Sequence, residues 1–140
     1  MKKSRETASP GLPEDLVKAI FGQIVSAVAY MHSKWVAHRD LKLENILINQ
    51  NEKQIKLIDF GFATKCKKGE KLSTHCGTPH YMDPDLAKKE SYYGHAADVW
   101  ALGVILFMLL TGRLPFFAEF EQDLYRKIIA GKYSYPLDYR

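Results

Sequence analysis

The residues with the clearest chemical potential form one short segment, His38-Arg39-Asp40-Leu41-Lys42-Leu43-Glu44-Asn45. It holds a carboxylate, a cation and an amide at fixed spacing, and a further carboxylate follows in Asp59-Phe60-Gly61. Phosphoryl transfer needs groups of these types, because an attacking hydroxyl must be oriented and negative charge must be neutralised. Taken alone, each segment is more often a solvated polar patch or a turn, so the surrounding elements decide between the two interpretations.

Periodic apolar residues predict a long helix before this segment and a hairpin after it. The helix opens at Pro13, a favourable first helical position, and ends near His32 or Ser33. Two β-rich runs, residues 46–48 and 55–58, flank a polar spacer and predict a β-hairpin. The predicted buried face of the helix recurs at steps of three and four residues: Leu16, Ile20, Ile24, Ala27 and Met31.

The second half of the chain predicts a long irregular segment followed by two helices. Residues 59–95 are rich in polar residues, glycine and proline, and loops of this length are often functional. The apolar run 96–110 predicts a helix buried on all sides, and its uninterrupted apolar part, 99–110, is too short to span a bilayer. The last helix is predicted from Glu121 to Ala130, with Gly131 as its stop.

Composition and charge exclude several classes of function. The 140 residues carry a net charge of +4, and the basic residues are scattered, so no nucleic-acid-binding tail is predicted. Cys66 and Cys76 lie in no disulfide or zinc pattern, which favours a reducing compartment. The basic start is followed by no apolar segment, which argues against a secretory signal. We expect a cytoplasmic or nuclear protein that binds neither nucleic acid nor membrane.

Four segments, in the correct order, resemble the motifs of eukaryotic Ser/Thr protein kinases. The segment from His38 to Asn45 is similar to the catalytic loop H-R-D-L-x-x-x-N, and Asp59-Phe60-Gly61 is similar to the metal-binding tripeptide. Gly77-Thr78-Pro79-His80-Tyr81-Met82 resembles the substrate-facing loop. Asp98-Val99-Trp100-Ala101-Leu102-Gly103 resembles the start of the central helix. The resemblance covers residues 12–136 and is closest in style to the calmodulin-dependent and AMP-activated branch.

The resemblance implies a protein-kinase-like (α+β) fold limited to the C-lobe, mainly α-helical with a small β-hairpin. Residues 1–11 are then a flexible lead-in, and residues 12–140 form a partial kinase domain. The implied cofactors are ATP and Mg²⁺, and the implied partner is a protein or peptide that offers a Ser or Thr hydroxyl. Glu44 matches a position that in many kinases faces a basic residue of the substrate.

The resemblance also implies a role for each residue of the site. Asp40 would orient the substrate hydroxyl and accept its proton, and Lys42 would be the cation beside the transferring phosphate. Thr78 completes the implied catalytic set. Asn45 and Asp59 would bind Mg²⁺, which prefers a few protein oxygens plus phosphate and water. The hairpin between these two residues would fold back and bring them together.

Further matching residues have implied structural or nucleotide-binding roles. His38 and Phe60 are expected to stack. Asp98 is expected to accept hydrogen bonds from the catalytic-loop backbone, since a buried carboxylate must be hydrogen-bonded. Leu47 matches a position beneath the adenine, joining Lys42 on the nucleotide side, although on sequence alone it is simply a core residue.

Thr74 is the implied regulatory site, because many kinases carry an activating phosphate there. A phosphate would add about −1.5 to −2 charges and could pair with Arg39. An upstream kinase would be the partner that attaches it. Ser73 is the alternative site.

Three features depart from the family pattern. No Gly-rich loop and no V-A-I-K lysine precede the catalytic loop, so the ATP-clamping N-lobe is missing and we expect little or no activity from this chain alone. Asp83 and Asp85 fall where Ala-Pro-Glu is usual, and Asp85 lacks its usual arginine, so this region is expected to be loose or Asp85 to reach water. Trp35 stands where glycine is usual, so its turn must differ or be strained.

Two rival interpretations remain open. A free C-lobe could dock substrates as a decoy or scaffold, without catalysis. Alternatively, the chain could be a truncated fragment of a longer kinase, which the unpartnered Asp85 favours. The intact Asp40, Asn45 and Asp59 favour catalysis over scaffolding, because scaffolding requires none of them.

Overall fold

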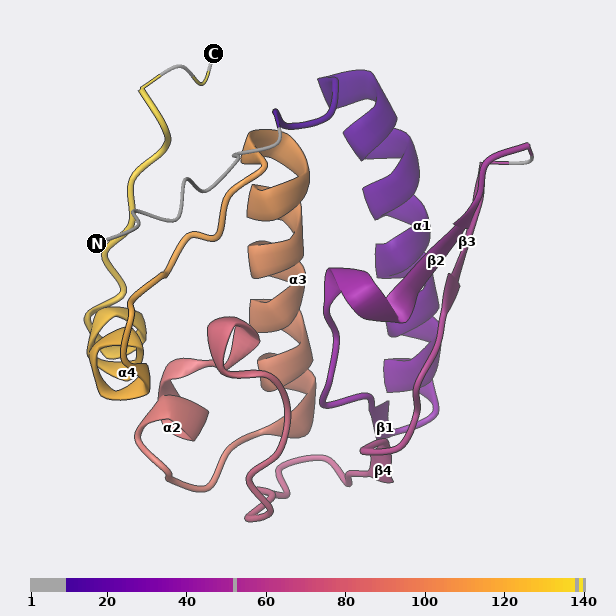
Figure 1. Cartoon of the computed structure of the whole chain (residues 1–140). Helices are drawn as coiled ribbons and strands as arrows, with labels where there is room; N and C mark the ends of the chain where they lie inside the picture. Colours follow the sequence, from indigo (N-terminus) through magenta and orange to yellow (C-terminus); the bar gives the residue numbers. More distant parts are fainter. Residues whose placement is uncertain (1–9, 52, 138, 140) are drawn as a thin grey trace.

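Two long helices lie side by side at the centre of the fold, with the smaller elements around them (Figure 1). The computed structural model describes residues 10–51, 53–137 and 139, so most of the predicted lead-in lies outside the described residues. In chain order the elements are α1 (Glu14–Ser33), β1 (Val36–Ala37), the 3₁₀ turn η1 (Leu43–Asn45), β2 (Ile46–Asn49), β3 (Gln54–Leu57), β4 (Thr64–Lys65), the 3₁₀ turn η2 (Pro79–Tyr81), α2 (Pro84–Ala87), α3 (Gly94–Thr111) and α4 (Glu121–Ala130). This confirms the predicted helical architecture with a small hairpin.

Helix α1 has the predicted bounds and a slightly rotated buried face. It begins directly after Pro13, and its fully buried residues are Val17, Ile20, Ile24 and Val28. Ile20 and Ile24 were predicted, whereas the predicted Leu16, Ala27 and Met31 are only half-buried. Successive residues lie about 100° apart around a helix, so the edge of a wide apolar face is poorly defined until its neighbour is known.

The predicted hairpin forms from β2 and β3, with Ile46 opposite Leu57 and Asn49 opposite Gln54. Gln23 of α1 holds it, since its side chain accepts from the Ile55 amide (3.1 Å) and donates to the Lys53 carbonyl (2.8 Å). The long segment 59–95 contains short elements that the sequence did not predict. Among them β4 pairs with β1 in antiparallel register, but each has only two residues, too few to show a period.

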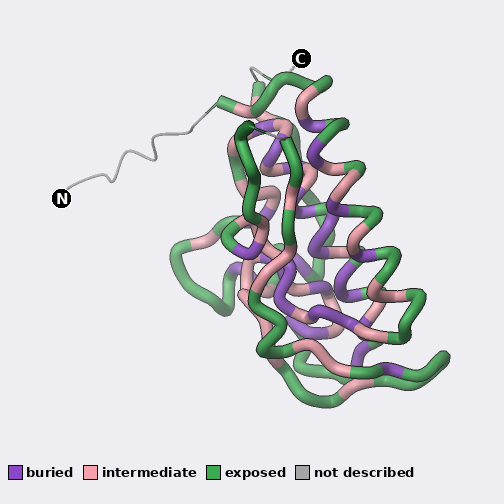
Figure 2. Tube along the Cα trace, turned by 90° about the vertical axis from the view of Figure 1, so that its right-hand side faces the viewer, coloured by how far each residue is buried: buried purple, intermediate pink, exposed green. Residues whose placement is uncertain are grey.

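Helix α3 is buried over most of its surface but leaves an exposed stripe at Ala96, Val99 and Gly103, so the expected burial on all sides is wrong. Val104 and Ile105 lie in the core with α1, whereas Val99 is 58% exposed, because the described residues cover only part of the helix. Figure 2 shows the buried residues gathered inside the fold and exposed ones along the outer edges. By length and composition α1 and α3 could each span a bilayer, but their packing against each other is that of core helices.

The segment before α1 crosses very close to the end of α3. The Leu12 amide donates to the Leu109 carbonyl (2.8 Å), and a Cβ on Gly11 would lie 1.8 Å from the Leu110 carbonyl oxygen. Only glycine fits this approach, so Gly11→Ala is expected to lower the free energy of unfolding by about 1–3 kcal/mol. Urea unfolding measures the change.

A matched control is Gly22→Ala in α1, where the added Cβ would meet no atom within 4 Å. Alanine favours the helix interior over glycine, so this variant is expected to gain up to about 1 kcal/mol. Equal effects at the two glycines would contradict the close approach of Gly11 to α3.

The turn between α1 and β1 carries the strain expected of Trp35. This residue has a φ of 56°, in the left-handed region that residues other than glycine rarely adopt. Its ring stacks on His95 at 5.7 Å between centroids, and its carbonyl accepts from the Cys66 amide (2.9 Å). Contacts with α3 and with the residue directly after β4 therefore hold a conformation that the backbone alone disfavours.

Candidate active site

The catalytic-loop segment is held by a single buried carboxylate on α3. Asp98, 1% exposed, accepts from the amides of His38 (2.9 Å) and Arg39 (3.0 Å), which confirms the predicted contact. Its Oδ2 also lies 2.8 Å from His32 Nε2, a partner that the sequence analysis missed. Arg39 has a φ of 69°, so the carboxylate fixes a backbone conformation that is unfavourable by itself.

His38 joins this loop to the segment before Asp59. Its Nδ1 accepts from the Asp40 amide (3.1 Å), so Nε2 carries the proton and donates to the Ile58 carbonyl (3.1 Å). The predicted contact with Phe60 is present, with ring centroids 5.1 Å apart in an edge-to-face arrangement. The two predicted motifs are therefore in direct contact.

The side chains of Asp40 and Lys42 both form hydrogen bonds with the Thr78 hydroxyl. The Thr78 hydroxyl donates to Asp40 Oδ1 (3.0 Å) and accepts from Lys42 Nζ (3.0 Å), while Lys42 Nζ lies 3.8 Å from Asp40 Oδ2. Asp40 is 7% exposed, so its carboxylate is screened little by water. Thr78 lies 36 residues after Lys42 and 38 residues after Asp40. The fold therefore brings these three predicted catalytic residues into one cluster.

The hairpin brings the two predicted metal ligands to the same end of the site. The Asn45 carbonyl accepts from the Ile58 amide (2.9 Å), which places Asp59 one residue beyond this bond. The buried Asn45 side chain donates through Nδ2 to the Asp40 carbonyl (2.8 Å), and no donor to its Oδ1 is recorded among the described residues. Asp59 is exposed, and its Oδ1 accepts only from the Gly61 amide (3.2 Å) within the described part of the chain.

These oxygens fit Mg²⁺ better than a metal held by protein ligands alone. No group of three His, Cys, Asp or Glu side chains that could hold a metal occurs in the described ranges. Mg²⁺ typically takes one or two carboxylates plus phosphate and water oxygens. One carboxylate at Asp59 and one amide oxygen at Asn45 match that requirement.

Leu47 is not a core residue, which corrects the interpretation drawn from the sequence alone. It lies in β2 and is 52% exposed, and its neighbour Ile48 is 45% exposed. Phe60 and Phe62 are also about half exposed on the segment that follows the hairpin. The reason is geometric: helix α1 packs mainly against β3, so β2 is the outer strand, and the described residues leave both of its faces largely uncovered.

Arg39 and the predicted phosphosite Thr74 are close without direct contact. Thr74 is exposed, and Arg39 donates through Nε to the Phe62 carbonyl (2.7 Å) and through Nη1 to the Tyr92 hydroxyl (3.3 Å). Tyr92 in turn donates to the Thr74 carbonyl (2.5 Å). Glu44, the predicted contact for a basic substrate residue, is exposed on η1.

Tyr81 is a positioning residue that the sequence analysis missed. Its hydroxyl accepts from the Leu43 amide (3.4 Å) and donates to Met108 Sδ (3.3 Å), so it links η2 to the catalytic loop and α3. Burial raises the pKa of this phenol, so it stays protonated and can serve both bonds. Residues 38 positions apart leave no local signal for such a contact.

Asp83 has a structural explanation. Its side chain accepts from the Leu86 amide (2.9 Å) and caps α2, so the segment after η2 is ordered by a cap. Asp85 is half-buried rather than enclosed, in agreement with the expectation that it reaches water.

Burial raises the pKa of Asp83, so keeping this carboxylate ionised lowers the stability of the folded state. A raised pKa in the folded state means that stability is fully present below the unfolded pKa and falls as pH rises through the folded pKa. Asp83→Asn keeps the acceptor without the charge, so it is expected to gain roughly 0.5 kcal/mol at pH 7. The gain should disappear toward pH 4 in urea unfolding. Asp83→Ala removes both the cap and the charge, so it should lose about 1 kcal/mol toward pH 4 and less at pH 7; a pH-independent Asn effect would contradict the assignment.

Comparison with known proteins agrees with this geometry. The family described as "Protein kinase domain" matches residues 2–137 of the chain. The chain belongs to the protein kinase family. Members of this family generally use ATP and Mg²⁺ and act on protein substrates.

The similar curated proteins are Ser/Thr kinases. "Probable serine/threonine-protein kinase MARK-A" of Dictyostelium discoideum is 47% identical over 89% of the chain, and "Maternal embryonic leucine zipper kinase" of Danio rerio is 49% identical over 92%. "Serine/threonine-protein kinase ppk25" of Schizosaccharomyces pombe is 39% identical over 89%. These relatives confirm the predicted branch. This chain therefore spans only 12%, 19% and 30% of the lengths of these three relatives, respectively.

Proposed function

We propose that this chain supplies the catalytic loop for ATP-dependent phosphoryl transfer to Ser and Thr hydroxyls of proteins. The observation that carries the proposal is the Thr78 hydroxyl, which donates to Asp40 and accepts from Lys42, each at 3.0 Å. An alcohol already occupies the position where a substrate hydroxyl would meet the carboxylate. The cluster can therefore orient a hydroxyl and accept its proton.

Each residue then has a defined part in the transfer. As the substrate oxygen bonds to the γ-phosphorus of ATP, its proton passes to the Asp40 carboxylate and ADP leaves. The Lys42 ammonium neutralises charge on the phosphoryl oxygens. Asn45 and Asp59 would hold the Mg²⁺ that neutralises the phosphates, and the exposed Leu47 offers an apolar surface to the adenine.

Thr74 is proposed as the regulatory site of this lobe. An upstream kinase would transfer the γ-phosphoryl group of ATP to Thr74 Oγ1, which loses its proton, and ADP would leave. Thr74 is exposed, so an enzyme can reach it. The Arg39 guanidinium, which also bonds to the Phe62 carbonyl, is the cation that a phosphate there would meet.

Substrate choice and location follow the same reasoning. The exposed carboxylate of Glu44 lies one residue before Asn45, where it can attract an Arg or Lys of the substrate peptide. The two free cysteines, Cys66 and Cys76, suit the reducing cytoplasm or nucleus.

Thermal unfolding with and without Mg²⁺–ATP tests the nucleotide site on this chain. A ligand that binds the native state raises stability by about 2.7 kcal/mol at a hundredfold excess over Kd, so millimolar nucleotide should raise the midpoint. Asp59→Asn should lose the shift, and Asp123→Asn, at an exposed surface ion pair, should keep it. A cooperative transition that ignores nucleotide would contradict the site and favour a docking module. No cooperative transition would favour the fragment interpretation.

A further inference from the structure

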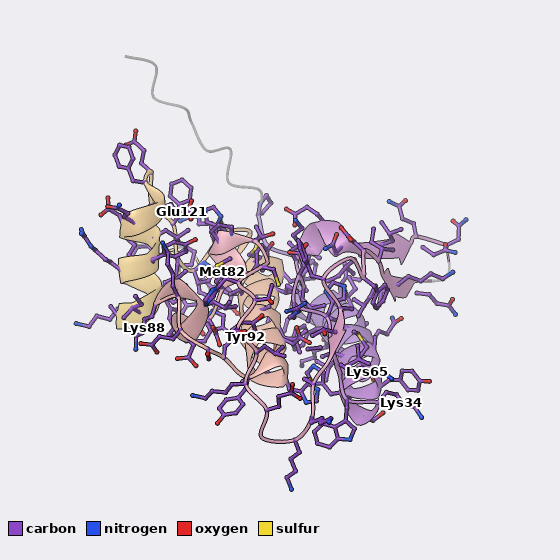
Figure 3. The ribbon with its side chains drawn as sticks, turned by 90° about the horizontal axis from the view of Figure 1, so that it is seen from below. Lys34, Lys65, Met82, Lys88, Tyr92 and Glu121 are labelled. Atoms are coloured by element: carbon purple, nitrogen blue, oxygen red, sulfur yellow. The ribbon has the colours of Figure 1, made fainter. Side chains whose placement is uncertain are left out.

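Tyr92 is a fully buried phenol at the junction of three loops. It lies just before α3 (Figure 3). The residue is 0% exposed. Its backbone forms two hydrogen bonds with Leu72, of 2.7 and 3.0 Å, which fix the start of the loop that carries Thr74. The His75 ring lies against its ring, with centroids 6.2 Å apart.

The hydroxyl of Tyr92 connects the catalytic loop to the predicted phosphosite. It accepts from Arg39 Nη1 at 3.3 Å and donates to the Thr74 carbonyl at 2.5 Å. Burial, the main cause, raises the pKa of this phenol, so it remains a donor at neutral pH. One hydroxyl therefore separates the backbone of residue 74 from the guanidinium.

We propose that Tyr92 is a positioning residue that holds Thr74 beside Arg39, so that a phosphate on Thr74 meets the guanidinium with little further ordering of the loop. The proposal rests on Thr74 as the phosphosite and deepens that part of the proposed function. It assigns to Tyr92 the coupling between the modified residue and the catalytic loop.

The donor inventory of Arg39 supports this arrangement. A guanidinium has five N–H donors. Among the described residues two side-chain donors of Arg39 have protein acceptors, the Phe62 carbonyl and the Tyr92 hydroxyl, so three remain. A phosphate can take two of them in a bidentate pair. Because the residue 74 carbonyl is already tied to Tyr92, less loop entropy is lost when that pair forms.

The test measures the second pKa of a phosphothreonine placed at position 74 by genetic incorporation, using ³¹P NMR on the 140-residue chain. Free phosphothreonine titrates near pH ~6, and an adjacent guanidinium favours the dianion. We expect the pKa to lie about 1 unit below that of the same chain unfolded in urea. In Tyr92→Phe this lowering should shrink to less than half, because the loop no longer holds residue 74 beside Arg39.

The neighbouring residue supplies the control. Tyr93 is exposed and lies against Lys71, so Tyr93→Phe should leave the lowering unchanged. His75, whose ring lies against that of Tyr92, is present in every protein compared, so it does not distinguish the variants. Equal lowering in wild type and Tyr92→Phe, or none in wild type, would overturn the proposal.

A measurement without substitution covers the case in which Tyr92→Phe fails to fold. Tyrosine labelled with ¹³C at Cζ reports hydrogen bonding at each phenol. Phosphorylation of Thr74 should shift the Tyr92 signal and leave that of Tyr93 in place; an unmoved Tyr92 signal would overturn the proposal. Neither titration nor labelling needs phosphoryl transfer by this chain, so the result is separate from the test of nucleotide binding.

Discussion

Replacing Asp98 by alanine is expected to lower the free energy of unfolding by about 3–5 kcal/mol. The carboxylate is 1% exposed and accepts from the amides of His38 and Arg39. Alanine would leave both buried amides without an acceptor, and it would leave His32 Nε2 without its partner at 2.8 Å. Since domains of this size are stable by about 5–15 kcal/mol, the variant should unfold at much lower urea.

Hydrogen exchange locates the effect. The amides of residues 38 and 39 should lose protection in Asp98→Ala before the rest of α1 and α3 does, because the positive φ of Arg39 is then no longer compensated. Asp123→Ala is the matched control, since this carboxylate pairs with Arg126 on the surface and should cost less than about 1 kcal/mol. A loss at Asp98 as small as at Asp123 would show that the carboxylate is not the anchor.

The contacts of Asp98 show how far sequence reasoning reaches. Residues that belong to recognisable motifs were placed correctly, as with Asp98 against the catalytic loop and His38 against Phe60. Helix ends were also predictable where a residue type forces them. Helix α4 ends at Ala130 because Gly131 adopts a left-handed φ of 66°.

The rest depends on contacts that no local pattern encodes. Tyr81 and Tyr92 lie in the segment predicted to be irregular. Tyr81 contacts a catalytic-loop residue 38 positions away, and Tyr92 contacts one 53 positions away. Their hydroxyls matter only because the loops cross there. The prediction that Leu47 lies in the core was wrong for the opposite reason. The residue is apolar, but its burial depends on which strand of the hairpin meets α1, and β2 is the outer strand.

Asp40→Asn should remove most of the phosphoryl transfer activity that this segment confers on a complete kinase. The activity test replaces the matching segment of the Danio rerio relative, 49% identical over 131 residues, by this chain. A general base contributes about 10²–10⁴-fold, so kcat for a Ser/Thr peptide should fall by at least about 100-fold in the variant. Asparagine has nearly the same shape, so the hydrogen bond from Thr78 can persist while proton acceptance is lost.

The two carboxylates of the site should differ in the step they affect. Asp40 is bonded to Thr78 and faces Lys42, whereas Asp59 lies beyond the hairpin where the nucleotide phosphates would bind Mg²⁺. Asp40→Asn should therefore keep the thermal shift produced by Mg²⁺–ATP, and Asp59→Asn should lose both the shift and turnover. An Asp40→Asn protein that retains full turnover would remove Asp40 as the base. Loss of the nucleotide-dependent shift in both variants would mean that Asp40 also supports nucleotide binding, for which its hydrogen bond from Asn45 Nδ2 (3.4 Å) supplies a route.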